Sequence, residues 1–294
     1  MMSSSHATAH TRHPIESRAI RNHYDRLSSL YQRFWGEHIH HGWWEDGESL
    51  PEAQEKLVRR LAEAAAIPRN SQVLDVGCGL GGSSRWLARE LACSVRGITL
   101  SPVQVKIATR RARESELDTR VHFERADAEQ IALEPESYDV VWSIECIEHL
   151  FDKRRFFMRA AQALKPGGSF AICTWLGTPE SPEHRAIVDQ VCRGMLCPSL
   201  GSLEDHVNWF QAAGLEVIRA EDVTANVART WDLARAVLDR PEVRALLAVS
   251  DRETRDFARA FTSMSDAYAS GAMGYGFFVA RKPGCLPDAA RATM

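Results

Sequence analysis

The sequence predicts an α/β fold with a Rossmann-like sheet and additional helical segments. An apolar segment that begins at residue 72 ends abruptly in glycines, which is typical of a buried strand followed by a tight turn and a helix. Four further apolar segments then alternate with helical patterns, and this order indicates a mostly parallel sheet covered by helices. The chain has 294 residues, 45% of them hydrophobic, which is enough for one such core with an elaborated cap.

Composition excludes several classes of partner and site. The net charge is −3, from 36 Lys and Arg against 39 Asp and Glu, so nothing favours binding to nucleic acid or to an anionic membrane. No apolar run reaches the roughly 18 residues of a membrane span, and we expect a cytoplasmic protein. The seven cysteines include no C-x-x-C pair, so neither a zinc site nor a disulfide framework is indicated. The two ends, 1–14 and 285–294, are predicted to be disordered tails, although the first faintly resembles a transit peptide.

Residues 15–50 are predicted to form a helical arm and a lid. Apolar side chains recur three or four residues apart over 15–34, the pattern of an amphipathic helix. A cluster of imidazole and indole side chains follows, and it can be interpreted as a metal site, as packed aromatics, or as a lid over a substrate pocket. We favour the lid, because no acid or cysteine stands at convincing ligand spacing. Its members are His40, His41, Trp43 and Trp44.

The glycine-rich turn follows a helix over 51–66 and the first strand. Gly77, Gly79 and Gly82 have the G-x-G-x-x-G spacing, in which glycines allow the backbone to approach a ligand closely. That spacing alone predicts only a nucleotide-like ligand. Asp75 precedes the turn, and its carboxylate would repel a dinucleotide pyrophosphate but attract an ammonium group. We therefore infer a cofactor that carries a cation at this point.

The second strand, 93–100, ends without the acid that usually binds an adenosine ribose. Thr99 stands at that place, and Ser101 and Gln104 could supply the hydrogen bonds instead. Ser101 is also a plausible N-cap for the helix that Pro102 opens.

The third and fourth strands, 121–125 and 138–143, are followed by polar side chains. Asp127 could accept a hydrogen bond from an adenine amine or could cap a helix. Glu145, Glu148 and His149 follow the fourth strand at the sheet's carboxyl edge, where open α/β folds bind ligands. They are the best placed titratable groups of the chain, although capping and surface charge would also explain them.

The rest of the chain completes the sheet and adds a cap. A helix over 153–164, a sharp turn at 165–168 and a strand over 169–175 end the core, which we place at 51–178. Residues 179–284 are expected to hold a substrate-cap insertion and the last strands. Their predicted elements are an insertion over 176–202, a helix over 203–213, a strand over 215–220, a helical pair over 226–247 and 252–269, and a final strand over 274–281.

Taken together, these motifs resemble a class I S-adenosylmethionine-dependent methyltransferase. The resemblance is carried by the acid and glycine turn, Thr99-Leu100-Ser101, Asp127-Ala128 and Lys165-Pro166-Gly167-Gly168. More narrowly, the chain is similar to the γ-tocopherol methyltransferase group at 38–44, 98–104, 143–150, 207–210 and 226–228. The likeness covers nearly the whole chain after about residue 15. That group and its neighbours methylate phenols, sugars and small amines.

The resemblance implies a seven-stranded sheet whose last strand, 274–281, runs antiparallel beside 169–175. It also implies S-adenosylmethionine as the cofactor and a set of residues that bind it: Asp75, Gly77, Gly79, Thr99, Leu100, Gln104, Asp127, Ala128, Ser143 and Tyr24. Related phosphobase enzymes pair a histidine at the place of His149 with a tyrosine, which Tyr24 matches. Cyclopropane-forming relatives need a cysteine where this chain has His40 and His41, and this argues against lipid cyclopropanation.

The expected function is methyl transfer to a small molecule, namely a phenolic, prenylated or natural-product hydroxyl or carbon. His149 is the expected general base, because the unperturbed pKa of imidazole lies nearest neutrality, and Glu148 would orient it or replace it. Trp43 and Trp44 would wall the acceptor. An alternative is N-methylation of a small amine such as sarcosine, dimethylglycine or phosphoethanolamine, held by cation–π contacts on these indoles. More distant alternatives are a nicotinamide oxidoreductase and a non-catalytic cofactor-binding protein.

Overall fold

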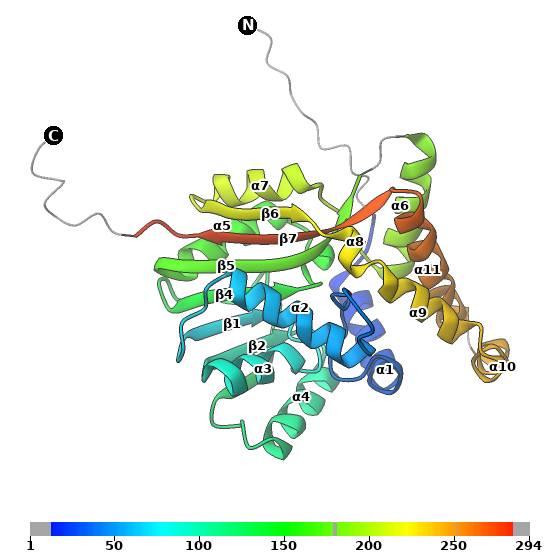
Figure 1. Cartoon of the computed structure of the whole chain (residues 1–294), viewed down its shortest axis with the longest axis horizontal. Coiled ribbons are helices and arrows are strands. Elements are labelled where there is room, and N and C mark those ends of the chain that lie inside the picture. The colour runs from blue at the N-terminus through cyan, green and yellow to red at the C-terminus, as the bar shows by residue number, and fades with distance from the viewer. Residues whose placement is uncertain (1–12, 179–180, 251, 285–294) are drawn as a thin grey trace, which may run out of the picture.

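The protein contains one seven-stranded sheet with the order β3-β2-β1-β4-β5-β7-β6 (Figure 1). A computed structural model describes residues 13–178, 181–250 and 252–284. The strands are β1 (Gln72–Val76), β2 (Ser94–Thr99), β3 (Val121–Arg125), β4 (Tyr138–Ile144), β5 (Leu164–Gly177), β6 (Glu216–Asp222) and β7 (Met273–Arg281). The predicted Rossmann-like α/β sheet is thus confirmed.

The last strand lies inside the sheet and not at its edge. β7 pairs antiparallel with β5, from Ser169 opposite Arg281 to Gly177 opposite Met273, and antiparallel with β6 on its other side. The five strands β1 to β5 pair with one another in parallel. The predicted antiparallel strand beside 169–175 is therefore confirmed, and the carboxyl ends of β1, β2, β3 and β4 meet at one edge.

Helices cover both faces and one end of the sheet. They are α1 (Ser17–Trp35), α2 (Leu50–Ala64), α3 (Gly82–Leu91), α4 (Pro102–Glu114), α5 (Lys153–Ala163), α6 (Pro182–Met195), α7 (Leu203–Ala212), α8 (Thr224–Val227), α9 (Arg229–Leu238), α10 (Pro241–Val249) and α11 (Arg252–Ala269), with a 3-10 turn at Ile147–His149. One core packs Leu57 of α2 and Leu87 of α3 on Val73, and a second packs Phe157 of α5 and Phe210 of α7. Figure 1 shows α1, α6, α9, α10 and α11 together at one end of the sheet.

Several element boundaries differ from the prediction. β5 already begins at Leu164, so the expected turn at 165–168 is part of the strand. Its pairing with β4 shifts register there, and Gly167 has a φ of 79°, which lets the strand bulge instead of turning. The expected helix over 226–247 is three helices, and the last of them starts at Pro241, because proline lacks the N–H that would continue the preceding helix.

The insertion after β5 contains a helix that the polar sequence did not indicate. In α6, Ser181 accepts a hydrogen bond from the backbone of His184, and Pro182 occupies the first turn, which together start the helix. The predicted N-cap of α4 is confirmed, since Ser101 Oγ accepts from Gln104 N at 3.1 Å.

The predicted tails fall largely outside the described residues, which exclude 1–12 and 285–294. His13, the first described residue, is buried and donates its backbone N–H to the Pro198 carbonyl at 2.9 Å. Within the described ranges, no helix is long and apolar enough to cross a membrane.

Candidate active site

A cavity, cavity A, lies at the carboxyl ends of β1 to β4 and is covered by α1 and residues 37–40. Most of the predicted cofactor residues line it. Those that do are Tyr24, Asp75, Gly77, Gly79, Thr99, Leu100, Gln104, Asp127 and Ala128. His40, predicted for the lid, and His149, predicted as the base, line the cavity as well. Ser143 does not: its hydroxyl donates to the backbone carbonyl of Val76 at 2.9 Å and holds β4 on β1.

Two glycines of the turn serve different purposes. Gly77 has a φ of 75°, and a Cβ there would lie 2.3 Å from the Cβ of Cys146, so packing against the loop after β4 requires glycine. Gly79 has a φ of 53° and faces open space, with nothing within 4 Å of an added Cβ. Only the second glycine leaves room in which a ligand could approach the backbone.

The Asp75 carboxyl is buried at the base of cavity A. Its Oδ2 accepts a hydrogen bond from the Ser84 hydroxyl at 2.5 Å. Burial raises the pKa of Asp75 to about 7, and the Ser84 bond opposes this only in part. A cationic ligand would offset the cost of burying the charge and restore the ionised form. The site therefore fits a group that carries an ammonium.

Polar side chains after β2 and β3 are bonded locally. Thr99 Oγ1 donates to Gln104 Oε1 at 2.6 Å, and both side chains line cavity A. Asp127 accepts from the backbone of Glu129 at 2.9 Å and from the side chain of Gln130 at 3.0 Å. Asp127 thus stabilises a turn and does not cap a helix, since the described residues between β3 and β4 form no helix, and it also lines the cavity.

A second cavity, cavity B, adjoins cavity A and is walled mainly by aromatic rings. Its lining consists of His23, Tyr24, Tyr31, Trp35, Ile39, His40, His41, Glu145, Glu148, His149, Trp175, Met195, Trp231 and Phe261. Five of these residues also line cavity A: Tyr24, Ile39, His40, Glu145 and His149. Any group passing between the two cavities must pass these side chains.

Tyr24 and His149 are hydrogen-bonded at this boundary. The Tyr24 hydroxyl lies 2.8 Å from His149 Nε2, and His149 Nδ1 lies 3.1 Å from the Leu196 carbonyl. Because a carbonyl only accepts, Nδ1 carries the proton and Nε2 accepts from the tyrosine. Burial lowers the pKa of His149 to about 4, so its imidazole is neutral at neutral pH.

Glu148 is buried but does not orient the imidazole. Its Oε1 accepts the backbone N–H of Trp175 at 2.7 Å, while Oε2 has no hydrogen-bond partner among the described residues. Burial, followed by the nearby Glu145 charge, raises the pKa of Glu148 to about 8. The expected bond from Glu148 to His149 is therefore replaced by the Leu196 carbonyl.

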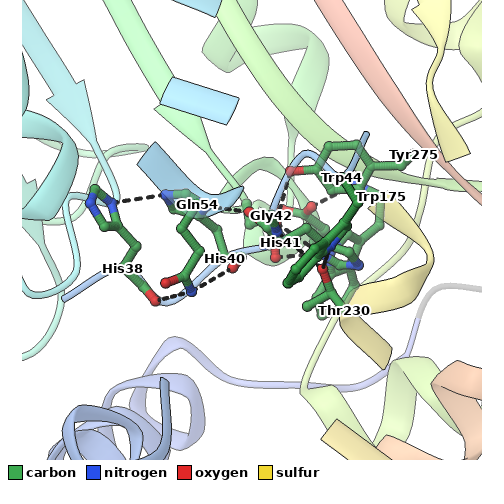
Figure 2. A network of polar contacts seen from close by, with 11 residues as sticks. His38, His40, His41, Gly42, Trp44, Gln54, Trp175, Thr230 and Tyr275 are labelled. Carbon is green, nitrogen blue, oxygen red and sulfur yellow. Dashed lines mark hydrogen bonds and ion pairs between the residues drawn. The ribbon is translucent and has the colours of Figure 1, made fainter. Parts of the chain in front are cut away.

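Glu145 is the centre of a polar network that joins the segment after α1 to the sheet. Its Oε1 accepts from His41 N at 2.7 Å, from His41 Nδ1 at 2.8 Å and from the Tyr275 hydroxyl at 2.8 Å. Its Oε2 accepts from Trp175 Nε1 at 3.1 Å. Figure 2 shows His41 beside Trp175 and Tyr275 in this cluster. Burial raises the pKa of the Glu145 carboxyl. The charge and hydrogen bonds of His41 are the largest of the effects that lower it, and the net result is a pKa below the ordinary value.

The remaining histidines of this segment bond to one another. His40 Nε2 lies 3.1 Å from His38 Nδ1, and His40 Nδ1 bonds the carbonyl of His41 at 2.7 Å (Figure 2). Gln54 of α2 donates to the carbonyls of both His38 and His40. In the described ranges, no three metal-binding side chains converge.

Trp43 and Trp44 lie away from cavities A and B. Trp43 Nε1 donates to Glu45, and Arg60 lies 5.3 Å from the centre of its ring. Trp44 Nε1 donates to Thr230 at 2.9 Å, and Arg229 lies 5.0 Å from its ring centre. These two indoles therefore do not line either cavity, where they were expected to wall the acceptor. Each of their rings is already in contact with a guanidinium group. The indole and other aromatic rings that line cavity B include those of Tyr31, Trp35, Trp175, Trp231 and Phe261.

Comparison with known proteins places this arrangement among methyltransferases. The family model described as mycolic acid cyclopropane synthetase matches residues 11–275. Tocopherol O-methyltransferase, chloroplastic, of Arabidopsis thaliana is 32% identical over 287 residues, covering 90% of this chain and 82% of the relative. The 27-O-demethylrifamycin SV methyltransferase of Amycolatopsis mediterranei is 32% identical over 262 residues, covering 88% of this chain and 95% of the relative.

A solved structure shows the same fold. It comes from Galdieria sulphuraria and was described as a candidate sarcosine dimethylglycine methyltransferase. The TM-score is 0.78 at 22% identity, and the match covers 88% of this chain and 99% of that chain. At this identity the likeness supports the fold.

Proposed function

This chain belongs to the mycolic acid cyclopropane synthetase family and is a class I S-adenosylmethionine-dependent methyltransferase of small molecules, and we propose that its acceptor is a phenol or another hydroxyl-bearing compound. Methylation at oxygen or at an adjacent ring carbon would both suit the site. The similarity to the tocopherol and rifamycin enzymes supports such an acceptor.

Cavity A is the proposed cofactor site. Its residues fit S-adenosylmethionine, because the buried Asp75 carboxyl calls for a cationic partner. We assign the methionine ammonium to Asp75 and the methionine backbone of the cofactor to the turn at Gly79. The ribose is assigned to Thr99, Leu100 and Gln104, and the adenine to Asp127 and Ala128. The bound cofactor supplies an electrophilic methyl group on a sulfonium. The chain then has to align the acceptor and exclude water.

The observation that carries this proposal is the shared boundary of the two cavities. Tyr24, His149 and Glu145 line both, so an acceptor in cavity B would meet a methyl donor in cavity A across them. More than half of the side chains that line cavity B are themselves buried, which would limit the access of water to the reacting groups.

Glu148, and not His149, is the general base in this proposal. A base is most effective when its pKa lies near the working pH. With a pKa of about 4, His149 is a weak base that serves mainly to hold Tyr24 in place. Glu148, which lines cavity B and has a pKa of about 8, is better matched to accept the proton of a phenol.

An acceptor screen with mass-spectrometric readout tests the function. Phenols, hydroquinones and macrocyclic alcohols are each incubated with the protein and S-adenosylmethionine, and the added methyl is located by fragmentation. The proposal expects methylation of at least one hydroxyl-bearing class, with turnover lost in Glu148→Gln. If phenols and alcohols stay unmodified while amines gain a methyl, the proposed acceptor class is wrong.

A small amine is the second candidate acceptor. The expected cation–π site on Trp43 and Trp44 is occupied by arginines, but cavity B combines the rings of Trp175 and Trp231 with the carboxyl of Glu148. Aromatic faces with a carboxyl favour a cation. Sarcosine, dimethylglycine and phosphoethanolamine therefore belong in the same screen.

Other expectations remain part of this proposal. Lipid cyclopropanation is disfavoured, since this chain has His40 and His41 where cyclopropane-forming relatives need a cysteine. From the composition we also propose a cytoplasmic location and no nucleic-acid partner. The free cysteines of the described residues are consistent with a reducing compartment.

A further inference from the structure

A third cavity, cavity C, lies beside cavity B between α1, α9, α10 and α11. It is mainly apolar, and Leu30, Ala234, Val237, Val243, Leu247 and Ala258 are among its lining. Its volume is about 300 Å³, against about 50 Å³ for cavity B. Cavity B accommodates a compact group, whereas cavity C has room for a longer one.

Cavities B and C share a wall of aromatic rings. Tyr31, Trp35 and Phe261 line both, and the rings of Trp35 and Phe261 meet edge to face with centres 5.5 Å apart. A molecule whose reactive end lies in cavity B, beside Glu148, would have to extend past these rings to reach cavity C.

The outer wall of cavity C is an unusual helix. α10 is rich in Val, Leu and Ala, yet none of its residues is buried, and Leu246 and Val249 are 51% and 83% exposed. Val243, Leu246 and Leu247 line the cavity. An apolar helix gains little from this position unless something apolar packs beneath it.

We propose that cavity C binds the apolar tail, alkyl or prenyl, of an acceptor whose head is methylated in cavity B. The proposal rests on the proposed function for the identity of the head. The occupant is part of the acceptor, and not a separate lipid or a second copy of the chain, because cavity C adjoins cavity B through shared side chains.

Calorimetric titration of 4-alkylphenols against the protein loaded with S-adenosylhomocysteine tests the tail directly. The series runs from 4-methylphenol to 4-dodecylphenol, below the concentration at which any member aggregates. We expect the Kd to fall about threefold to fourfold for each added methylene until the tail fills the cavity. A Kd that is independent of tail length would overturn the proposal.

A matched pair of variants on α10 locates the tail. Leu247→Asp puts a charge into cavity C, whereas Val249→Asp puts the same charge on the exposed side of the helix. Leu247→Asp should weaken binding of 4-dodecylphenol at least about tenfold and leave 4-methylphenol unchanged. Val249→Asp should match the wild type. Equal losses in both variants would contradict the proposal. Ala234→Phe, which narrows the cavity from α9 with an apolar side chain, replaces Leu247→Asp if that variant does not fold.

Two further measurements separate the tail from the head. Turnover of the same phenols is followed by mass spectrometry. Methylation that ignores tail length refutes the tail site but leaves the proposed function intact. Tail-dependent binding without methylation of any phenol refutes the phenol acceptor but supports cavity C. If 1-dodecanol binds as tightly as 4-dodecylphenol, the occupant is a separate lipid and the proposal fails.

Discussion

The hydroxyl of Tyr24 lies 2.8 Å from Nε2 of His149, although 125 residues separate them in the chain. The bond joins α1 to the turn after β4, and the Leu196 carbonyl fixes the other imidazole nitrogen from the loop after α6. Three distant segments thus meet where cavities A and B adjoin. The pair is built to hold both side chains neutral and in one orientation.

Tyr24→Phe should show how much the hydrogen bond between Tyr24 and His149 contributes to stability and activity. The phenylalanine ring can keep the stacked contact with Tyr31, 6.2 Å between centres, but leaves buried Nε2 of His149 without a donor. We expect the free energy of unfolding to fall by about 1–3 kcal/mol, and kcat/KM to fall about tenfold. Urea unfolding and steady-state kinetics measure both. In a cycle with His149→Phe, simple additivity of the two losses would show that the residues do not act as a unit.

Glu148 should make stability depend on pH with a predictable sign. Its pKa is raised from 4.5 to about 8, so the folded protein keeps a proton that the unfolded chain releases. The proton bound to Glu148 therefore stabilises the folded protein. This contribution to the free energy of unfolding is complete below pH 4.5 and is lost as the pH rises to about 8. Glu148→Gln removes this dependence, and its stability relative to the wild type should improve by roughly 1.4 kcal/mol per pH unit in that window. Urea unfolding at several pH values checks the slope, and a constant difference would contradict it.

The same carboxyl predicts the pH profile of turnover. If Glu148 accepts the acceptor proton, kcat/KM should rise with pH and level off above about 8. Glu148→Gln should retain binding of S-adenosylhomocysteine, because Glu148 does not line cavity A, yet lose turnover. Retention of the wild-type profile in the variant would remove the proposed base.

Asp75 should couple cofactor binding to pH. Because burial raises its pKa to about 7, an ammonium ligand that favours the carboxylate binds less tightly as pH falls below 7. The Kd of S-adenosylhomocysteine should rise up to about tenfold per pH unit there. In Asp75→Asn we expect at least about a tenfold higher Kd at pH 8 and little pH dependence. Calorimetry checks this, with exposed Asp118→Asn as the control.

The sheet and its glycine turn were predictable because their signals are local. Buried parallel strands appear as continuous apolar runs, and the predicted bounds of β3, 121–125, are those observed. The turn after β1 needs glycine at Gly77, since any Cβ would collide with Cys146. These demands fall on single positions and so are visible in the sequence.

The walls of the site were less predictable because they depend on long-range packing. Indoles near the histidines suggested Trp43 and Trp44, but Trp175 and Trp231 line cavity B from β5 and α9. Nothing in the local sequence tells which way an indole points. The Leu196 carbonyl that orients His149 is a backbone group, and a backbone contact leaves no mark in residue identity.

Glu145→Gln should loosen the segment after α1. The carboxylate accepts four hydrogen bonds, three of them on Oε1, from His41 and Tyr275, and the fourth on Oε2 from Trp175. A glutamine has one acceptor oxygen, so its amide N–H₂ would face either the indole N–H or the cluster of donors around His41. Leaving buried donors unpaired should lower the free energy of unfolding by about 2–4 kcal/mol. Exposed Glu134→Gln is the control, and urea unfolding of both variants is the measurement.

Hydrogen exchange at the His41 amide should also speed up in Glu145→Gln, because that N–H loses its charged acceptor. Unchanged exchange together with unchanged stability would mean that Glu145 does not anchor this segment.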